Sequence, residues 1–401
     1  MREHRLEVAD VFRQHGEAFR KRWAHTLSPQ QRKALRDIGA CRTAALGGHI
    51  EQCDGCPHEV MAYNSCRNRH CPKCQSTARD HWLAERAKEL LPVPYCHVVF
   101  TVPESLTALA LQNPPLVYGL LFRAVSQTLL EIAADPRHLG ARIGFLAVLH
   151  TWSQNLRFHP HIHCVVPAGG LAPDGSRWIR CRRKFFLPVK VLSRMFRGKF
   201  LALLRDAFAD GKLQFHGPLA AIREPARFHA WLRPLRDVEW VVFAKPPFGG
   251  PEYVLKYLAR YTHRVAISNG RLLSLENGRV TFRWRDSKDH NQIKIMALDA
   301  VEFIRRFLLH ILPSGFVKIR HFGFLSSRRR TAALTLCRQR LPQPVASADP
   351  APILTEQQQC AVERRCPVCG IGKLHIRRWV SAAELLERLD PPGPIYQINS
   401  S

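Results

Sequence analysis

The chain has 401 residues, 46% of them apolar, so it is long enough for two or three domains with a buried core. Lysine and arginine total 60 against 32 aspartate and glutamate residues, which gives a formal charge of +28. Such a basic surface attracts a polyanion, so nucleic acid is the expected partner. No apolar run approaches the roughly 18 to 20 residues of a membrane span, and the charged start lacks a signal peptide. We therefore expect a cytoplasmic protein without membrane contact.

The first part of the chain, residues 1–92, contains a short helical lead-in, a cysteine cluster and a helix over 76–91 that ends before a proline. Two CxxC pairs about 15 residues apart have the spacing of two knuckles that close a tetrahedral thiolate site on zinc. The pairs are Cys53 with Cys56 and Cys71 with Cys74. We predict that these four hold one structural zinc ion. Cys66 and His70, between the pairs, either replace a ligand or lie beside the site.

Three cations, Arg67, Arg69 and Lys73, stand among these predicted ligands. They would present positive charge on a rigid, metal-bound surface, which suits DNA contact.

Strands and helices interleave from residue 93 onward. CHVVFTV (96–102), RIGFLAVLHTW (142–152), HPHIHCVVPAGGL (159–171) and VEWVVFA (238–244) are predicted strands, and 114–134 has helical periodicity. This order predicts an α+β fold with a central, mainly antiparallel sheet. RLLSLENGRVTFRWR (271–285) is a predicted hairpin that turns at Asn277 and Gly278. A helix over 297–312 follows.

Two histidines in the predicted strand 159–171 share one face. Residues two apart on a strand project from the same side, so His161 and His163 can bind one metal ion while Ile162 packs inward. The third ligand stays open among Gln154, Asn155 and His159.

Three tyrosines follow at intervals of four within a predicted helix from about residue 251 to 263. This spacing places Tyr253, Tyr257 and Tyr261 along one helical face. An aromatic packing stripe has the same spacing. A phenol is a weak nucleophile when protonated, so phosphoryl transfer by tyrosine needs a Lewis acid at the phosphate, which a histidine-bound divalent ion supplies.

The end of the predicted middle domain (93–341) is basic with interleaved aromatic residues, and it includes Arg328, Arg329 and Arg330. This composition is typical of a DNA-contacting segment or of a solvated helical face. The last part, 342–401, is predicted as a Pro-rich linker and a basic, cysteine-containing tail. Only Cys360 and His375 lie close enough in sequence to complete a local site with Cys366 and Cys369, so we expect no second zinc there.

The combination of these motifs resembles a known family. The H-I-H motif followed by Tyr257-LAR-Tyr261-THRVAIS is similar to the two-tyrosine transposases of bacterial rolling-circle insertion sequences, which carry a His-hydrophobic-His (HUH) motif. The segments SCRNRHCPKCQ and CRTAALGGH resemble the zinc-binding region that precedes the catalytic domain in that family. The likeness extends from about Cys41 to about Phe324.

The resemblance implies an HUH-type sheet of RRM-like topology, flanked by helices and preceded by a small zinc-binding module. His161 and His163 would lie on a central strand and bind a catalytic Mg²⁺ or Mn²⁺. Tyr257 and Tyr261 would be paired nucleophiles that form 5′-phosphotyrosine links with single-stranded DNA at the transposon ends and the target. The protein would be nucleoid-associated when bound to DNA. The absence of a Walker-type segment agrees with a reaction that needs no ATP.

Three alternatives remain at the level of the sequence. A replication initiator or conjugative relaxase also uses tyrosine with clustered histidines. A zinc-bearing DNA-binding regulator would use the histidines and tyrosines only for packing. A tyrosine recombinase acts on duplex DNA without a metal, and sensitivity of cleavage to EDTA would separate it. The oligomeric state cannot be read from the residues.

Overall fold

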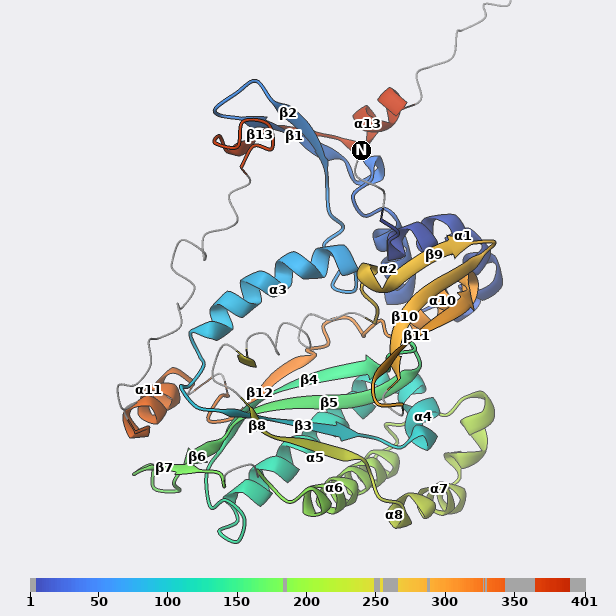
Figure 1. Ribbon diagram of the computed structural model, residues 1–401. Helices are drawn as coiled ribbons and strands as arrows, with labels where there is room; N and C mark the ends of the chain where they lie inside the picture. Colours follow the sequence, from blue (N-terminus) through green and yellow to red (C-terminus); the bar gives the residue numbers. More distant parts are fainter. Residues whose placement is uncertain are drawn as a thin grey trace, which may run out of the picture.

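The fold was analysed on a computed structural model that describes residues 5–182, 186–248, 253–254, 266–286, 289–326, 328, 330–342 and 365–389, with the backbone alone for 76–81, 248 and 388–389. The predicted α+β class is confirmed. A five-stranded, fully antiparallel sheet in the order β12-β4-β5-β3-β8 forms the centre (Figure 1). Its strands are β3 (Tyr95–Thr101), β4 (Gly144–Trp152), β5 (Phe158–Pro167), β8 (Val242–Phe248) and β12 (Ile319–Gly323).

One face of this sheet is covered by a layer of helices. Alternate residues of the three inner strands, among them Phe100, Ala147 and Ile162, point into the largest hydrophobic core. The helices on this side are α4 (Thr107–Gln112), α5 (Pro114–Ala134), α6 (Val189–Ala209), α7 (Pro225–Leu232) and α8 (Pro234–Asp237). The inward packing expected for Ile162 is therefore confirmed. A small hairpin of β6 (Gly169–Leu171) and β7 (Trp178–Arg180) lies beside this layer.

Helix α5 departs from the expectation that no segment could span a membrane. By length and hydropathy it is apolar enough to do so, but 61% of its most apolar stretch is buried inside the protein. It packs along α6 and under the sheet, with Leu121, Phe122 and Val125 at most 1% exposed. In this fold α5 is the central core helix, which accounts for its continuous apolar composition.

The opposite face of the sheet carries a smaller core at one end. Leu146, Val148 and Val165 from β4 and β5 pack there with side chains from α3 (Pro72–Ala87) and α11 (Arg330–Arg340). α3 begins with Cys71 as its N-cap and Pro72 in its first turn, a position where the missing amide of proline costs nothing. The other end of this face holds the histidines described below.

A second unit combines N-terminal helices with a sheet and a helix from residues 272–308. Its sheet, β11-β10-β9, comprises β9 (Leu272–Glu276), β10 (Arg279–Asp286) and β11 (Gln292–Asp299), and α10 (Ala300–Leu308) follows it. The predicted hairpin is confirmed, since Asn277 and Gly278 both have positive φ (49° and 70°), as a two-residue type I′ turn requires.

The helices α1 (Val8–Trp23) and α2 (Pro29–Gly39) pack on this second unit. The Phe12 and Phe307 rings, from α1 and α10, meet edge-on at 5.2 Å. The N-terminal helices therefore share a core with residues 266–308 and do not form a separate module. An amphipathic helix must bury its apolar face, and here the partner comes from the distant part of the chain.

The third unit is a three-stranded sheet in the order β13-β1-β2. β1 (Gly48–Cys53) pairs with β2 (Glu59–Tyr63) on one side and with β13 (Leu374–Val380) on the other, and α13 (Ala382–Leu389) follows (Figure 1). The packing thus differs from the predicted boundaries at 92 and 341, because the C-terminal segment completes an N-terminal sheet. The predicted linker, from residue 343, lies outside the described residues.

Candidate active site and metal centres

Three histidines converge on the face of the central sheet opposite α5 and α6. His161 and His163 project from β5, which is the middle strand, and His150 projects from the neighbouring β4. The register places His150 directly across from His161. One ring nitrogen from each histidine lies within 4.8 Å of the other two. Neighbouring antiparallel strands therefore assemble a three-imidazole site.

Hydrogen bonds define which nitrogens face a metal. His161 Nδ1 lies 2.6 Å from the carbonyl oxygen of His159 and donates to it, which leaves Nε2 of His161 for coordination. His163 Nδ1 lies 2.9 Å from His97 Nε2 on β3, which likewise leaves Nε2 of His163. Metal-binding histidines are commonly fixed through their other ring nitrogen in this way.

Burial keeps the imidazoles of His161 and of its neighbour His97 neutral. It lowers the pKa of His161 to about 4 and the pKa of His97 to about 3, mainly because the charged form loses its hydration. Both rings are therefore neutral near pH 7. A neutral imidazole offers its lone pair, so His161 fits a divalent ion as a donor.

His150 is the ligand that the sequence interpretation missed. Of the three candidates, His159 is not part of this group of histidines. The Asn155 side chain instead accepts a hydrogen bond from the Ser153 hydroxyl at 2.6 Å, within the turn between β4 and β5. His150 stands in the predicted strand 142–152, but its place opposite His161 depends on strand register, which the sequence does not reveal.

The tyrosine segment is described only at its beginning. Tyr257 and Tyr261 lie outside the described residues, whereas Tyr253 and Val254 are helical. Tyr253 is 64% exposed. Val254 is fully buried in the smaller core on the histidine-bearing face of the sheet, together with Val148. The chain therefore enters the tyrosine segment on that face.

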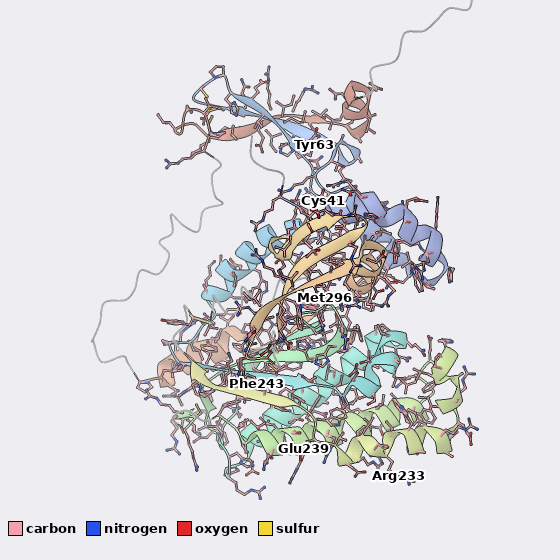
Figure 2. The ribbon with its side chains drawn as sticks, turned by 45° about the vertical axis from the view of Figure 1, so that its right-hand side comes forward. Cys41, Tyr63, Arg233, Glu239, Phe243 and Met296 are labelled. Carbon is pink, nitrogen blue, oxygen red and sulfur yellow. The ribbon has the colours of Figure 1, made fainter. Side chains whose placement is uncertain are left out.

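The cysteines form two groups, and the predicted grouping is wrong. The first group joins Cys71 and Cys74 at the start of α3 to Cys41, after α2, and Cys66, after β2. The second joins Cys53 and Cys56 to Cys366 and Cys369. The two predicted CxxC pairs thus belong to different sites, because the β1–β2 hairpin carries the first pair away from α3 (Figure 2).

The first group has the spacing of a zinc site. Cys74 Sγ lies 3.7 Å from Cys41 Sγ and 3.6 Å from Cys66 Sγ, and Cys71 Sγ lies 3.7 Å from Cys41 Sγ. Four sulfurs about 2.3 Å from a tetrahedral zinc stand about 3.8 Å apart. Hydrogen bonds from Cys66 and Cys71 lower the pKa of Cys41 to about 7, which favours the thiolate. Cys66 is thus a ligand candidate.

His70 does not join this group. Its Nε2 accepts a hydrogen bond from the Leu312 backbone amide at 3.1 Å, and burial lowers its pKa to about 3. Its role is to hold the chain after α10 against the zinc-binding segment.

Two family models match parts of this chain. A family model described as "Putative transposase" matches residues 144–332, and a model described as "Transposase zinc-binding domain" matches residues 11–102. The protein "Putative transposase y4qJ" of Sinorhizobium fredii (strain NBRC 101917 / NGR234) is 56% identical over 375 residues, which cover 92% of this chain and 94% of that protein. The chain therefore belongs to the same transposase family as this relative.

A second relative and one solved structure are more distant. The "Transposase for insertion sequence element IS801" of Pseudomonas savastanoi pv. phaseolicola is 29% identical over 80% of this transposase and 76% of that protein. The solved structure of TrwC complexed with a 27-mer DNA comprising the recognition hairpin and the cleavage site matches at 16% identity and a TM-score of 0.22. It covers 43% of this chain and 68% of that one.

Several cations of the transposase that were predicted to contact DNA have partners within the protein. Arg69 donates to the carbonyl of Phe316 at 2.8 Å, Lys73 pairs with Glu7 at 2.5 Å, and Arg330 pairs with Glu89 at 2.7 Å. These three side chains join separate segments of the fold. Arg67 and Arg328 are exposed, and Arg329 lies outside the described residues. The prediction of DNA contact is therefore kept for Arg67 and Arg328.

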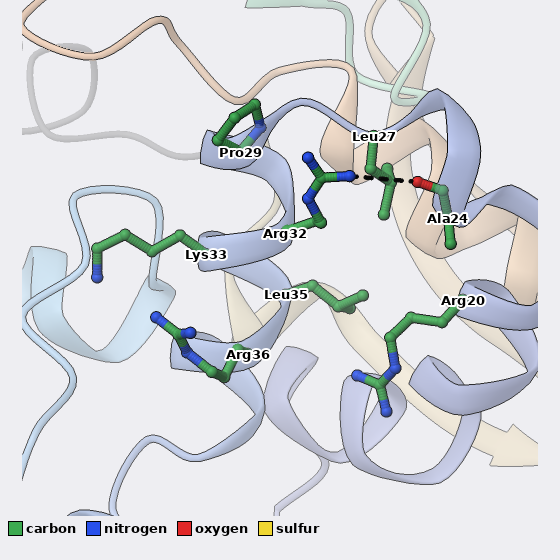
Figure 3. Close-up of a pocket in the computed structure, with 8 residues that line it drawn as sticks. All are labelled: Arg20, Ala24, Leu27, Pro29, Arg32, Lys33, Leu35 and Arg36. Atoms are coloured by element: carbon green, nitrogen blue, oxygen red, sulfur yellow. Dashed lines mark hydrogen bonds between the residues drawn. The ribbon is translucent and has the colours of Figure 1, made fainter.

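A basic hollow between α1 and α2 was not foreseen. It encloses about 490 Å³ and is lined by Arg20, Arg32, Lys33 and Arg36, with Leu27 and Leu35 behind them (Figure 3). Arg20 pairs with Glu17 at 2.6 Å and Lys33 with Asp37 at 2.5 Å. The excess of cations gives this surface a positive potential that attracts phosphate groups.

His97 is expected to act as a positioning residue for His163. Replacing His97 with alanine removes the hydrogen-bond partner of His163 Nδ1 and should weaken Mn²⁺ binding by about 10-fold to 100-fold. A glutamine at position 97 offers an amide oxygen and should restore most of the affinity. Titration calorimetry with Mn²⁺ measures both. Equal affinity of the alanine variant and the wild type would show that His97 serves packing alone.

Proposed function

We propose that this transposase nicks and transfers single-stranded DNA through a 5′-phosphotyrosine intermediate, with Tyr257 and Tyr261 as nucleophiles. The observation that carries the proposal is the three-histidine site on the middle of the sheet, with Val254 buried on the same face. Tyr257 and Tyr261 follow Val254 by three and seven positions, spacings that share one face of a helix. The helix expected over residues 251–263 would carry both tyrosines onward from this buried position.

The chain's own groups have distinct tasks in this reaction. His150, His161 and His163 would hold a divalent ion, for which Mg²⁺ and Mn²⁺ are the candidates. When bound, such an ion polarises the scissile phosphate and offsets its developing charge. A tyrosine hydroxyl loses its proton and attacks phosphorus, and the 3′ oxygen leaves and takes up a proton. The new phosphotyrosine bond conserves the phosphodiester energy, so the second tyrosine can repeat the exchange during strand transfer.

The edge strand β8 supports a path for single-stranded DNA beside this site. Phe243 and Lys245 are paired across from Val99 and His97, so both point to the histidine-bearing face. Phe243 is 50% exposed and lies on the outer strand of the sheet (Figure 2). An exposed aromatic ring can stack on a base while a neighbouring cation contacts phosphate. Single-stranded DNA at the element ends and at the target is the proposed partner, in the cytoplasm.

The test is covalent adduct formation. Labelled single-stranded DNA from the element's own ends is incubated with the protein and magnesium, manganese or zinc, then resolved on denaturing gels. The wild type should give a metal-dependent protein-linked 5′ fragment. The double variant Tyr257→Phe/Tyr261→Phe should lose it by on the order of 10³-fold or more, because no nucleophile remains. Each single variant shows which tyrosine acts first.

The matched control is Tyr253→Phe, one helical turn earlier, which should retain adduct formation. DNA binding without an adduct, unchanged by all the tyrosine variants on verified end sequences, would refute the enzyme and leave a zinc-bearing DNA-binding regulator. An adduct confined to a replication origin or transfer origin would instead support a replication initiator or relaxase.

A further inference from the structure

Two CxxC knuckles from distant parts of the chain face each other. Cys53 Sγ lies 3.7 Å from Cys369 Sγ, and Cys56 Sγ lies 3.6 Å from Cys366 Sγ. A disulfide requires sulfurs about 2.05 Å apart, whereas thiolates around a tetrahedral zinc stand about 3.8 Å apart. All four sulfurs lie within 4.8 Å of one another. Their spacing therefore fits zinc coordination and not two disulfides.

Backbone amides are arranged around three of these sulfurs. The Gly55 amide lies 3.3 Å from Cys53 Sγ, the Val368 amide lies 3.4 Å from Cys366 Sγ, and the Gly372 amide lies 3.3 Å from Cys369 Sγ. An N–H group that donates to sulfur stabilises the charged thiolate. The thiolate is the form that binds zinc. Both knuckles thus have the backbone conformation of metal-binding turns.

The backbones of the two knuckles also approach each other closely. A Cβ atom at Gly372 would lie 2.4 Å from Cys53 Sγ and 2.8 Å from the Gly55 nitrogen, so only glycine permits this approach. The Lys373 amide donates to Asp54 Oδ1 at 2.7 Å, and the Asp54 amide donates to the Lys373 carbonyl at 3.1 Å. The pairing of β1 with β13 continues directly from these contacts.

We propose that Cys53, Cys56, Cys366 and Cys369 bind one zinc ion that clasps the C-terminal strand β13 onto the N-terminal hairpin. The matched zinc-binding domain ends at residue 102, so half of this site lies outside it. The two halves are more than 300 residues apart in sequence. Closing so long a loop costs conformational entropy, and the free energy of zinc binding to the folded site offsets that cost. Residues 365–389 are then an integral part of the zinc-binding unit.

Zinc content of the full-length protein tests the composition of the site. Native mass spectrometry compares the wild type with Cys53→Ser/Cys56→Ser, Cys366→Ser/Cys369→Ser and the variant that carries all four changes. Each should contain one zinc fewer than the wild type, and the fourfold variant should lose no more than either pair. Cys181→Ser and Cys360→Ser are controls that should keep the wild-type content.

Several outcomes of this measurement would overturn the proposal. They are an unchanged zinc content in Cys366→Ser/Cys369→Ser, a loss of two zinc ions in the fourfold variant, and a loss in Cys360→Ser, which would indicate a local C-terminal site.

In a second experiment, the chelator arm keeps all four cysteines and so does not depend on the folding of a cysteine variant. A specific protease site is placed within residues 343–364 of the otherwise intact chain, and the protein is cleaved after purification. The C-terminal fragment should remain bound to the rest of the protein and should dissociate when a zinc chelator is added. The same protein with Cys366→Ser/Cys369→Ser should release the fragment without chelator. A C-terminal fragment that stays bound after the chelator is added, and also in the Cys366→Ser/Cys369→Ser protein, would show that strand pairing alone holds it.

Discussion

Replacing His150, His161 and His163 together with alanine should lower the rate of DNA strand cleavage by roughly 10³-fold or more. A bound metal contributes several kcal/mol of charge stabilisation at the phosphate, and each 1.36 kcal/mol is about a factor of ten in rate. The three rings supply the metal-binding nitrogens of this site. Single-turnover cleavage of labelled single-stranded DNA measures the loss. Binding of the same DNA should change little, because the basic surfaces remain.

Single substitutions in the same experiment test whether His150 or His159 is the third metal ligand. His150→Ala removes a ring of the cluster, so it should reduce both Mn²⁺ affinity and cleavage. His159→Ala should preserve both, because the His159 backbone carbonyl, which the substitution retains, accepts the hydrogen bond from His161 Nδ1, and only a ring contact at 5.4 Å is lost. If His159→Ala abolished cleavage while His150→Ala left it intact, the assignment of the third ligand would be wrong.

Loss of the first cysteine group should produce the largest change in stability. Structural zinc in small domains contributes apparent binding free energies of about 10 to 16 kcal/mol, which become folding free energy. Cys71→Ser/Cys74→Ser removes two of its four ligand candidates. We expect the loss of one zinc and a fall in melting temperature of about 10 °C or more, since 1 kcal/mol corresponds to roughly 2 to 4 °C in a chain unit of 150 to 250 residues. Differential scanning calorimetry measures this shift.

The packing explains why the effect should spread beyond the cysteines. Cys41 and Cys71 are fully or almost fully buried in the same core as Phe12, Ile304 and Phe307, which joins α1 and α2 to α10. Without zinc the segment between α2 and α3 would lose its anchor, and this core would open. Cys181→Ser, outside both groups, should leave the melting temperature within about 2 °C. A pair variant that also stayed within this range would show that this group does not hold a structural zinc.

Local patterns in the sequence determined the class of the fold and most of its elements. Apolar runs rich in β-branched residues identified β3, β4 and β5, and the Asn277–Gly278 turn identified the hairpin, because these signals depend only on neighbouring residues. The H-I-H motif likewise placed His161 and His163 on one face, since strand alternation is a local property. The likeness to two-tyrosine transposases supplied the family.

Tertiary structure alone decided which of these elements meet. His150 joined the site because β4 pairs with β5 in one register, and a shift by one residue would turn its ring to the other face. The two cysteine groups differ from the prediction, which combined the two CxxC pairs closest in sequence, because the folded chain brings other cysteines closer to each pair. Cys53 and Cys56 lie beside Cys369 and Cys366, which precede β13 and are more than 300 residues away in sequence. Spacing in sequence can predict a metal site only when its ligands lie within one short segment. The burial of α1 on α10 and the approach of Gly372 to Cys53 depend on contacts between distant segments, which form when the whole chain folds.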